Sequence, residues 1–314
     1  MKRIVFAILL AAGLIWSGPA RAEAPLTLML DWFPNVDHLP IYVAQERGYF
    51  AEEGIAVKIL SPSDTADALK LAAAGKVDLA VSYEPQTVIA ASQGIDLRVV
   101  GRLIEHPLTT LLFLKSSGFK TPADLNGRTI GYTVPGLMDS LMKAFAKVNG
   151  ITDYKLVNVG FSIVPALSAG RVDAVMGPFK TYETVTMAAK GLEAGYFELE
   201  RWGIPDYDEL IFICGTGTLA DKRSEIKGFR RAVARGIAAV AMSPEAALED
   251  YFRAVPDADR ATETAAFGLT RQYYAAGQTC DVNRWQAFAD FALQHGLIET
   301  PVNVAPLLPV LNGK

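Results

Sequence analysis

The chain has 314 residues, of which 51% are hydrophobic, and its 34 acidic residues slightly outnumber its 30 basic ones. This mild acidity disfavours a nucleic-acid-binding protein, which carries a basic surface stripe. With two cysteines, three histidines and no CxxC, HExxH or EF-hand pattern, the sequence predicts neither a disulfide scaffold nor a metal site.

The first residues are typical of a secretion signal. Lys2 and Arg3 precede an apolar run of about 13 residues, and Ala20-Arg21-Ala22 follows as a cleavage site. The run is shorter than the roughly 20 residues that a retained transmembrane helix needs. We therefore expect residues 1–22 to be removed on export. The mature chain would begin near Glu23 and, without three of its basic residues, carry a net charge of −7 instead of −4.

Apolar, strand-like runs alternate with helical stretches through the first two thirds of the chain. This alternation predicts βαβ units and therefore an α/β fold with mainly parallel sheets. The expected strands are 26–30, 57–60, 77–82, 97–103, 110–114, 129–133, 156–159, 172–176 and 210–214. The expected helices are 41–53, 65–74, 85–93, 137–149, 164–169 and 181–190, followed by a helical tail from residue 219.

One phrase recurs about 95 residues apart: AGKVDLAV at 74–81 and AGRVDAVM at 169–176. Turns between helices and strands resemble one another, but a match of this length favours two similarly built lobes. Gly75 and Gly170 would each end a helix in the left-handed conformation. With crossings near 105–110 and 203–215, we expect lobe one to comprise 23–107 and 216–314, and lobe two 108–215. The tail should pack on lobe one.

Four segments resemble the NMT1/THI5-like family of solute-binding proteins: LDWFPNVDHLPIYVAQERGYFAEEGI, AGKVDLAVSY, LKSSGFKTPADLNGRTIGY and AGRVDAVMGPF. The resemblance covers nearly the whole mature chain. It implies a type II-like periplasmic binding protein fold, in which two hinged α/β lobes close on a small molecule. The partners implied are the permease and ATPase subunits of an ABC importer at the inner membrane. Among family members, those that bind thiamine pyrimidine precursors such as formylaminopyrimidine are the most similar, and riboflavin, nitrate and sulfonate carriers are the alternatives.

The family also includes fungal pyrimidine synthases, in which a lysine carries pyridoxal phosphate and a nearby histidine is consumed. Matching the GKVD strand puts Ser82 at the lysine position and Gln86 at the histidine position. A Schiff base requires an amine, which Ser82 lacks. The phosphate-binding GEFGK stretch corresponds to TVPGL at 133–137, and the cysteine-rich run to FICGT at 212–216. The resemblance therefore implies a binding protein without a cofactor.

The loop after the first strand mixes residues that suit a flat, polar, nitrogen-rich ligand. Loops at the carboxyl ends of strands carry ligand contacts in α/β folds. Trp32 offers a face for stacking, Asn35 a donor and an acceptor, and Asp31 an acceptor for a ring amine. Their structural alternatives are a surface aromatic, a turn-forming asparagine and a cap. His38 would contact either the ligand or the start of the helix near Pro40.

A second candidate loop follows the AGKVD strand. Ser82, Tyr83 and Glu84 precede a helix whose free N–H groups favour a polar or anionic ligand group. Ser82 and Glu84 are equally typical of helix caps, and Tyr83 belongs either to the cleft or to the core.

Lobe two contributes the remaining candidates. Glu183 is the family-matched acceptor for the amine of an aminopyrimidine, with Tyr182 as its stacking neighbour, although a glutamate on a solvated helix face is the alternative. Tyr132 and Gly136 lie in another cleft loop, where Gly136 would permit close approach of the backbone. An anion carrier would need a cationic side chain in these loops, for which Lys180 is the strongest candidate.

Overall fold

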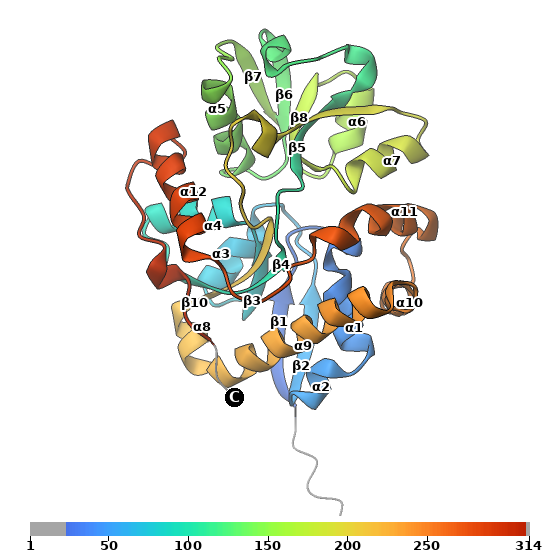
Figure 1. Cartoon of the computed structure of the whole chain (residues 1–314), viewed down its shortest axis with the longest axis vertical. Helices are drawn as coiled ribbons and strands as arrows, with labels where there is room; N and C mark the ends of the chain where they lie inside the picture. The colour runs from blue at the N-terminus through green and yellow to red at the C-terminus, as the bar shows by residue number, and fades with distance from the viewer. Residues whose placement is uncertain (1–22, 312–314) are drawn as a thin grey trace, which may run out of the picture.

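The computed structural model describes residues 23–311, which form two lobes, each built on a five-stranded sheet (Figure 1). The strand orders, β2-β1-β3-β10-β4 and β7-β6-β8-β5-β9, share one topology. The first sheet comprises β1 (Ala24–Met29), β2 (Ile55–Leu60), β3 (Leu79–Ser82), β4 (Leu97–Ile104) and β10 (Leu210–Gly215). The second comprises β5 (Thr109–Leu114), β6 (Arg128–Tyr132), β7 (Tyr154–Asn158), β8 (Ala174–Phe179) and β9 (Ala194–Glu198).

Each sheet combines parallel and antiparallel pairs. In the first, β1 pairs in parallel with β2 and β3, whereas β10 is antiparallel to β3 and β4. In the second, β6 pairs in parallel with β7 and β8, whereas β5 is antiparallel to β8 and β9. Four strands of each sheet therefore run in one direction, and a single strand, β10 or β5, runs against them because it enters from the opposite lobe. The short edge strand β9 has no counterpart among the predicted elements.

Helices flank both sheets (Figure 1). The helix predicted over 41–53 is split in two, because Gly48 adopts a positive φ of 71° between the halves. The first lobe contains α1 (Leu39–Glu46), α2 (Tyr49–Glu52), α3 (Asp67–Ala73) and α4 (Glu84–Ser92), and the second α5 (Met138–Val148), α6 (Ile163–Ser168) and α7 (Glu183–Ala189). The tail forms α8 (Thr216–Asp221), α9 (Arg223–Met242), α10 (Pro244–Ala254), α11 (Arg260–Thr270) and α12 (Val282–His295).

The aspartate of the repeated Val-Asp phrase accepts an equivalent hydrogen bond in both lobes. Asp78 accepts hydrogen bonds from the backbone N–H of Thr27 at 2.7 Å and from its hydroxyl at 2.9 Å. Asp173 accepts one from the backbone N–H of Thr129 at 2.8 Å. Each aspartate thus ties the start of the central strand of its sheet, β3 or β8, to the neighbouring strand, β1 or β6. The preceding glycines, Gly75 and Gly170, adopt positive φ as predicted.

The tail contacts both lobes rather than lobe one alone. Helix α9 packs along α1, where Gly236 lies so close that a Cβ would be 2.2 Å from the carbonyl oxygen of Pro40. Helix α12 contacts α4 and α5, and α11 contacts α7 and the 3-10 turn η1 (Val36–His38). Among residues 23–311, no helix is both long and apolar enough to span a membrane. The predicted signal, 1–22, lies outside the described residues.

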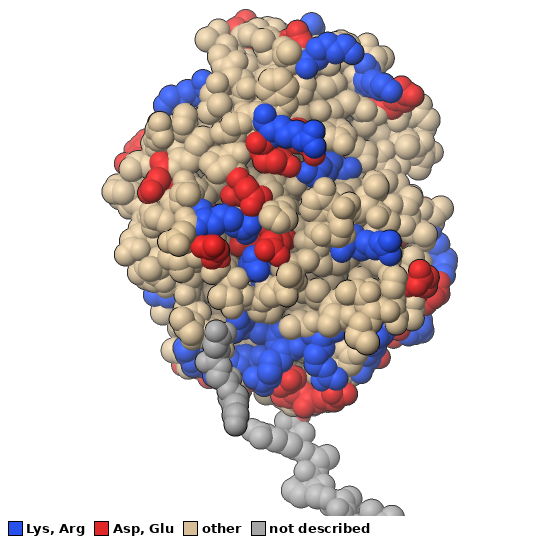
Figure 2. Space-filling model, viewed as in Figure 1, with Lys and Arg blue, Asp and Glu red and all other residues tan. Residues whose placement is uncertain are grey.

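Most of the face shown in Figure 2 is uncharged; acidic and basic side chains lie beside one another in groups near its centre, and basic ones gather at its lower end. Helix α9 runs across that end (Figure 1). Its Arg231 and Arg235 form ion pairs with Glu53 and Glu52. The basic charge on α9 is thus partly neutralised by acidic neighbours. Both cysteines fall in the described region and are free, Cys214 buried and Cys280 half-buried.

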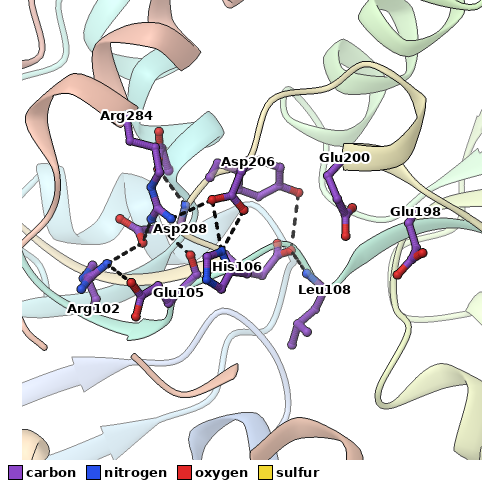
Figure 3. A network of polar contacts seen from close by, with 12 residues as sticks. Arg102, Glu105, His106, Leu108, Glu198, Glu200, Asp206, Asp208 and Arg284 are labelled. Carbon is purple, nitrogen blue, oxygen red and sulfur yellow. Dashed lines mark hydrogen bonds and ion pairs between the residues drawn. The ribbon is translucent and has the colours of Figure 1, made fainter. Parts of the chain in front are cut away.

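Two segments connect the lobes, 105–108 on the way out and 203–209 on the way back. Figure 3 shows that they run together through a polar network. Glu209 accepts hydrogen bonds from the backbone N–H groups of Leu108 and Thr109 at 2.6 and 2.7 Å, and His106 Nδ1 lies 3.0 Å from Asp206. The division into lobes by residue number stays a proposal, and β10, at 210–215, pairs within the first sheet.

The C-terminal helix α12 also holds this hinge. Buried Asp208 accepts hydrogen bonds from Trp285 Nε1 at 2.8 Å and from Arg102 at 3.2 Å, and it is ion-paired with Arg284. Arg284 also bonds to Asp206 in the same segment. The return segment is therefore anchored to α12 as well as to the outgoing strand (Figure 3).

Candidate functional site

A pocket lies between the two lobes, where strands of both sheets end. It encloses about 370 Å³ including its open mouth. The lining comes from both lobes, as the rule for α/β folds predicts: Asp31, Trp32, Asn35, Asp37, His38, Tyr83 and Leu210 from the first, and Thr133, Ile163, Gly177, Phe179, Tyr182 and Glu183 from the second.

Asp31 organises the first-lobe side of the pocket. Its carboxylate accepts a hydrogen bond from the Tyr83 hydroxyl at 2.7 Å and lies 2.8 Å from His38 Nε2. His38 Nε2 lies against Asp31, so Nε2 carries a proton, and Nδ1 is an acceptor when the imidazole is neutral and a donor when it is protonated. The buried Nδ1 has no partner within the described part of the chain, although buried polar atoms are nearly always paired. Nδ1 of His38 therefore remains for a hydrogen bond to a ligand.

Asn35 has a clear structural role in the same loop. Its side-chain oxygen accepts a hydrogen bond from the backbone N–H of Asp37 at 2.8 Å and caps the η1 turn. The turn-forming alternative therefore holds. Because Asn35 also lines the pocket, the cap fixes the loop that carries Asp31, Trp32 and His38.

Asp37 and Glu183 add two more buried carboxyl groups to the pocket. The pKa of Asp37 is raised to about 8, chiefly by burial and also by the neighbouring carboxylates of Glu183 and Asp31, while His38 acts in the opposite direction. Burial raises the pKa of Glu183 to about 7, against the effect of the Phe179 backbone N–H that donates to it at 2.6 Å. Among the described lining residues there is no lysine or arginine. The described lining therefore lacks the cationic side chain that an anionic ligand would need.

Aromatic side chains close the pocket. Trp32 contacts Phe161, from the loop before α6, with ring centroids 4.5 Å apart, and Phe33 contacts the same ring at 4.4 Å. Tyr182 lines the pocket with its ring, while its hydroxyl donates to Glu263 on α11 at 2.7 Å. A flat ligand can therefore lie against apolar faces while its edges meet carboxylates.

The family model described as NMT1/THI5 like matches residues 35–247, more than half of the chain. The chain belongs to this family. A Haemophilus influenzae protein named for thiamine biosynthesis is 36% identical over 302 residues, or 95% of this chain and 96% of that protein. The formylaminopyrimidine-binding protein of Halalkalibacterium halodurans is 34% identical, over 73% of this chain and 70% of that one.

Other relatives within the NMT1/THI5-like family bear an enzyme's name. They are called 4-amino-5-hydroxymethyl-2-methylpyrimidine phosphate synthases and include proteins of Legionella pneumophila and Uromyces fabae, at 32% and 26% identity. Among solved structures, the alkanesulfonate-binding protein of Xanthomonas axonopodis bound to MOPS superposes with a TM-score of 0.72 at 17% identity. It covers 91% of this chain and 98% of its own. This likeness shows the periplasmic binding protein fold.

Four of the predicted site residues lie outside the pocket lining of this NMT1/THI5-like chain. Ser82 donates to Gln86 at 2.8 Å, and Glu84 accepts from the backbone N–H of Asp208 at 2.7 Å and so supports the hinge. Gly136, with a φ of 84°, forms the turn before α5, and Tyr132 is half-buried at the end of β6. The structure gives three of them other partners, and Tyr132 packs partly buried against the core.

The anion-carrier candidate Lys180 also lies outside the lining. It forms ion pairs with Glu198 at 3.1 Å and with Glu200 at 2.8 Å. Its charge is therefore compensated outside the cleft, which removes the cation expected for binding nitrate or sulfonate.

Six lining residues were not among the predicted ones: Asp37, Thr133, Ile163, Gly177, Phe179 and Leu210. Asp37 lies in the loop that the sequence singled out, so its carboxylate could have been included. Gly177 was less clearly marked as a site residue in the sequence than Asp37. Its φ is 124°, and a Cβ there would be 2.0 Å from Thr133 Oγ1, so only glycine fits between these two strand ends. The apolar lining residues resemble core residues in sequence.

Proposed function

We propose that the protein is the periplasmic solute-binding component of an ABC importer and captures a thiamine pyrimidine precursor by closure of its two lobes. The observation that carries the proposal is the composition of the interlobe pocket. It combines aromatic walls with three carboxyl groups, at Asp31, Asp37 and Glu183, and with Nδ1 of His38, which has no partner among the described residues. The family relative named as a formylaminopyrimidine-binding protein supports the same ligand class.

An aminopyrimidine matches these groups in a definite way. Its ring stacks on Trp32, in a contact worth roughly 1–3 kcal/mol for a base on an aromatic side chain. Its exocyclic amine donates to Glu183, and hydrogen bonds to charged groups contribute roughly 1.5–3 kcal/mol. Contacts from both lobes then favour the closed state, and this difference in affinity drives closure.

The competing functions have less support. A nitrate or sulfonate carrier would need a cation in the cleft, and Lys180 is ion-paired elsewhere. A synthase that uses pyridoxal phosphate would need an amine where Ser82 bonds to Gln86. We therefore propose binding without catalysis. Export rests on the predicted signal, and mass spectrometry of the natural product would contradict it by finding residues 1–22 retained.

Thermal unfolding of the purified mature chain with a ligand panel tests the function. The panel contains formylaminopyrimidine, a related aminopyrimidine, riboflavin, nitrate, an alkanesulfonate and pyridoxal phosphate. A ligand present at ~100 times its Kd stabilises the folded state by roughly 2.7 kcal/mol. We expect this for the aminopyrimidines alone. Stabilisation by an anion alone, or a borohydride-trapped pyridoxyl-lysine in the cleft, would overturn the proposal.

A further inference from the structure

Three contacts outside the hinge join the lobes around the pocket. The Thr65 hydroxyl donates to the carbonyl oxygen of Thr133 at 2.7 Å. Phe161 of the second lobe packs against Trp32 and Phe33 of the first, although Phe33 is 50% exposed. The Tyr182 hydroxyl donates to Glu263 at 2.7 Å. Each of these contacts joins two protein groups and so does not require a bound ligand.

The Glu263 contact is the most specific of the three. Glu263 is only 3% exposed, on α11, and is not part of the pocket lining. One carboxylate oxygen accepts from the backbone N–H of Val36 at 2.9 Å, within the loop that carries the first-lobe ligand candidates. The other accepts from Tyr182, the residue preceding α7 in the second lobe. A single carboxylate thus joins the two walls of the pocket.

The two bonds of Glu263 differ in their dependence on closure. Val36 lies in η1, which α11 contacts within the first lobe, so this bond is kept when the lobes separate. Tyr182 moves with the second sheet, so its bond to Glu263 exists only when the lobes are closed. The hydroxyl of Tyr182 is directed to Glu263, while the ring lines the pocket. The bond therefore fixes the orientation of a pocket wall at the moment of closure.

We propose that Glu263 is a positioning residue that couples closure to the pocket: it holds the Asp31–His38 loop through Val36 and latches Tyr182 over the bound ligand. The inference rests on the proposed binding function only where it concerns the release of a ligand. Because the latch needs no ligand, it also favours the closed state of the free protein. It slows ligand release by stabilising closure without touching the ligand.

Tyr182→Phe tests the latch, because it removes the hydroxyl and keeps the ring. Closure of the ligand-free protein is measured by energy transfer between dyes on the two lobes and by small-angle scattering. We expect the ratio of closed to open protein to fall ~10-fold, as for loss of a hydrogen bond to a charged group. The dissociation rate of a bound aminopyrimidine should rise by about the same factor. Unchanged closure and an unchanged dissociation rate would overturn the inference.

Four further variants separate the effect of the latch from general destabilisation. Tyr83→Phe removes a comparable hydroxyl, bonded to buried Asp31, but both partners lie in the first lobe. It should leave closure of the free protein as in the parent. Glu263→Ala should open the free protein as Tyr182→Phe does, and the double variant should open it no further. Glu263→Gln retains a polar partner for Tyr182, so it should keep part of the closure that Glu263→Ala loses. Additive effects in the double variant would contradict the coupling.

These readouts distinguish the latch from the proposed function. If no aminopyrimidine binds but Tyr182→Phe opens the free protein, the latch stands and the ligand assignment fails. If an aminopyrimidine binds the parent and Tyr182→Phe leaves both closure and release unchanged, the function stands and the latch fails.

Discussion

At the scale of single residues, Trp32 combines two roles, since it lines the pocket and contacts Phe161 across the lobes. Trp32→Ala should lower the affinity for an aminopyrimidine about ten- to a hundred-fold, because stacking contributes roughly 1–3 kcal/mol. Calorimetry measures the change. Phe161→Ala is the matched control, because it removes the interlobe ring contact and keeps Trp32. If both variants lose the same affinity, closure rather than stacking explains the effect.

Glu183 gives a second prediction at this scale, which concerns the selectivity of binding. Glu183→Gln keeps the shape of the side chain but replaces one acceptor oxygen with a donor. It should weaken an aminopyrimidine by about ten-fold or more, as for loss of a hydrogen bond to a charged group, and should weaken an analogue without the amine much less. Calorimetry with the two ligands checks this, with circular dichroism to confirm the fold. Equal losses for both ligands would place the amine elsewhere.

At the scale of secondary-structure elements, two helical glycines should respond in opposite ways to substitution. A Cβ at Gly236 of α9 would lie 2.2 Å from the Pro40 carbonyl of α1, whereas one at Gly268 of α11 meets nothing within 4 Å. Gly236→Ala should therefore destabilise the protein by about 1–3 kcal/mol through overpacking. Gly268→Ala should stabilise it by roughly 0.5–1 kcal/mol through helix propensity. Urea unfolding measures both, and equal signs would contradict the packing of α1 on α9.

At the scale of the whole molecule, buried carboxyl groups set the pH dependence of stability. The pKa is raised to about 8 for Asp37, and to about 7 for Glu183 and for the hinge residue Glu209. In the unfolded chain such groups lose their protons near pH 4. The folded protein thus holds more protons between about pH 4 and 8, so its stability falls as pH rises through this range. Asp78 and Glu105, whose pKa values are lowered, act in the opposite sense below this range.

The free energy of unfolding of the ligand-free protein should therefore be lower at pH 8 than at pH 5.5, by an amount on the order of a few kcal/mol. Urea unfolding across this range measures it. Glu183→Gln should flatten the slope, because the amide does not titrate. A stability that rises steadily from pH 5.5 to 8 would show that these carboxyl groups are solvated in the free protein.

The sequence alone determined the features that depend on neighbouring residues. The loop that begins with Asp31 and Trp32 follows a strand, and Gly75 and Gly170 end helices with positive φ, because each is specified by local backbone preference. The repeated phrase likewise indicated two similar lobes. Tyr182 and Glu183 were identified by their place after the matching strand, and both line the pocket.

Only the tertiary structure decided which side chains of the predicted loops contact one another. Ser82 and Glu84 occupy a predicted ligand position, yet Ser82, at the end of β3, bonds to Gln86 of α4, and Glu84 bonds to the hinge residue Asp208. Glu263 lies 227 residues after Val36, and nothing local in the sequence marks their contact. The raised pKa values of Asp37 and Glu183 also follow from burial between the lobes. Burial, pairing and interlobe bonds depend on how segments that are distant in sequence meet in the folded chain.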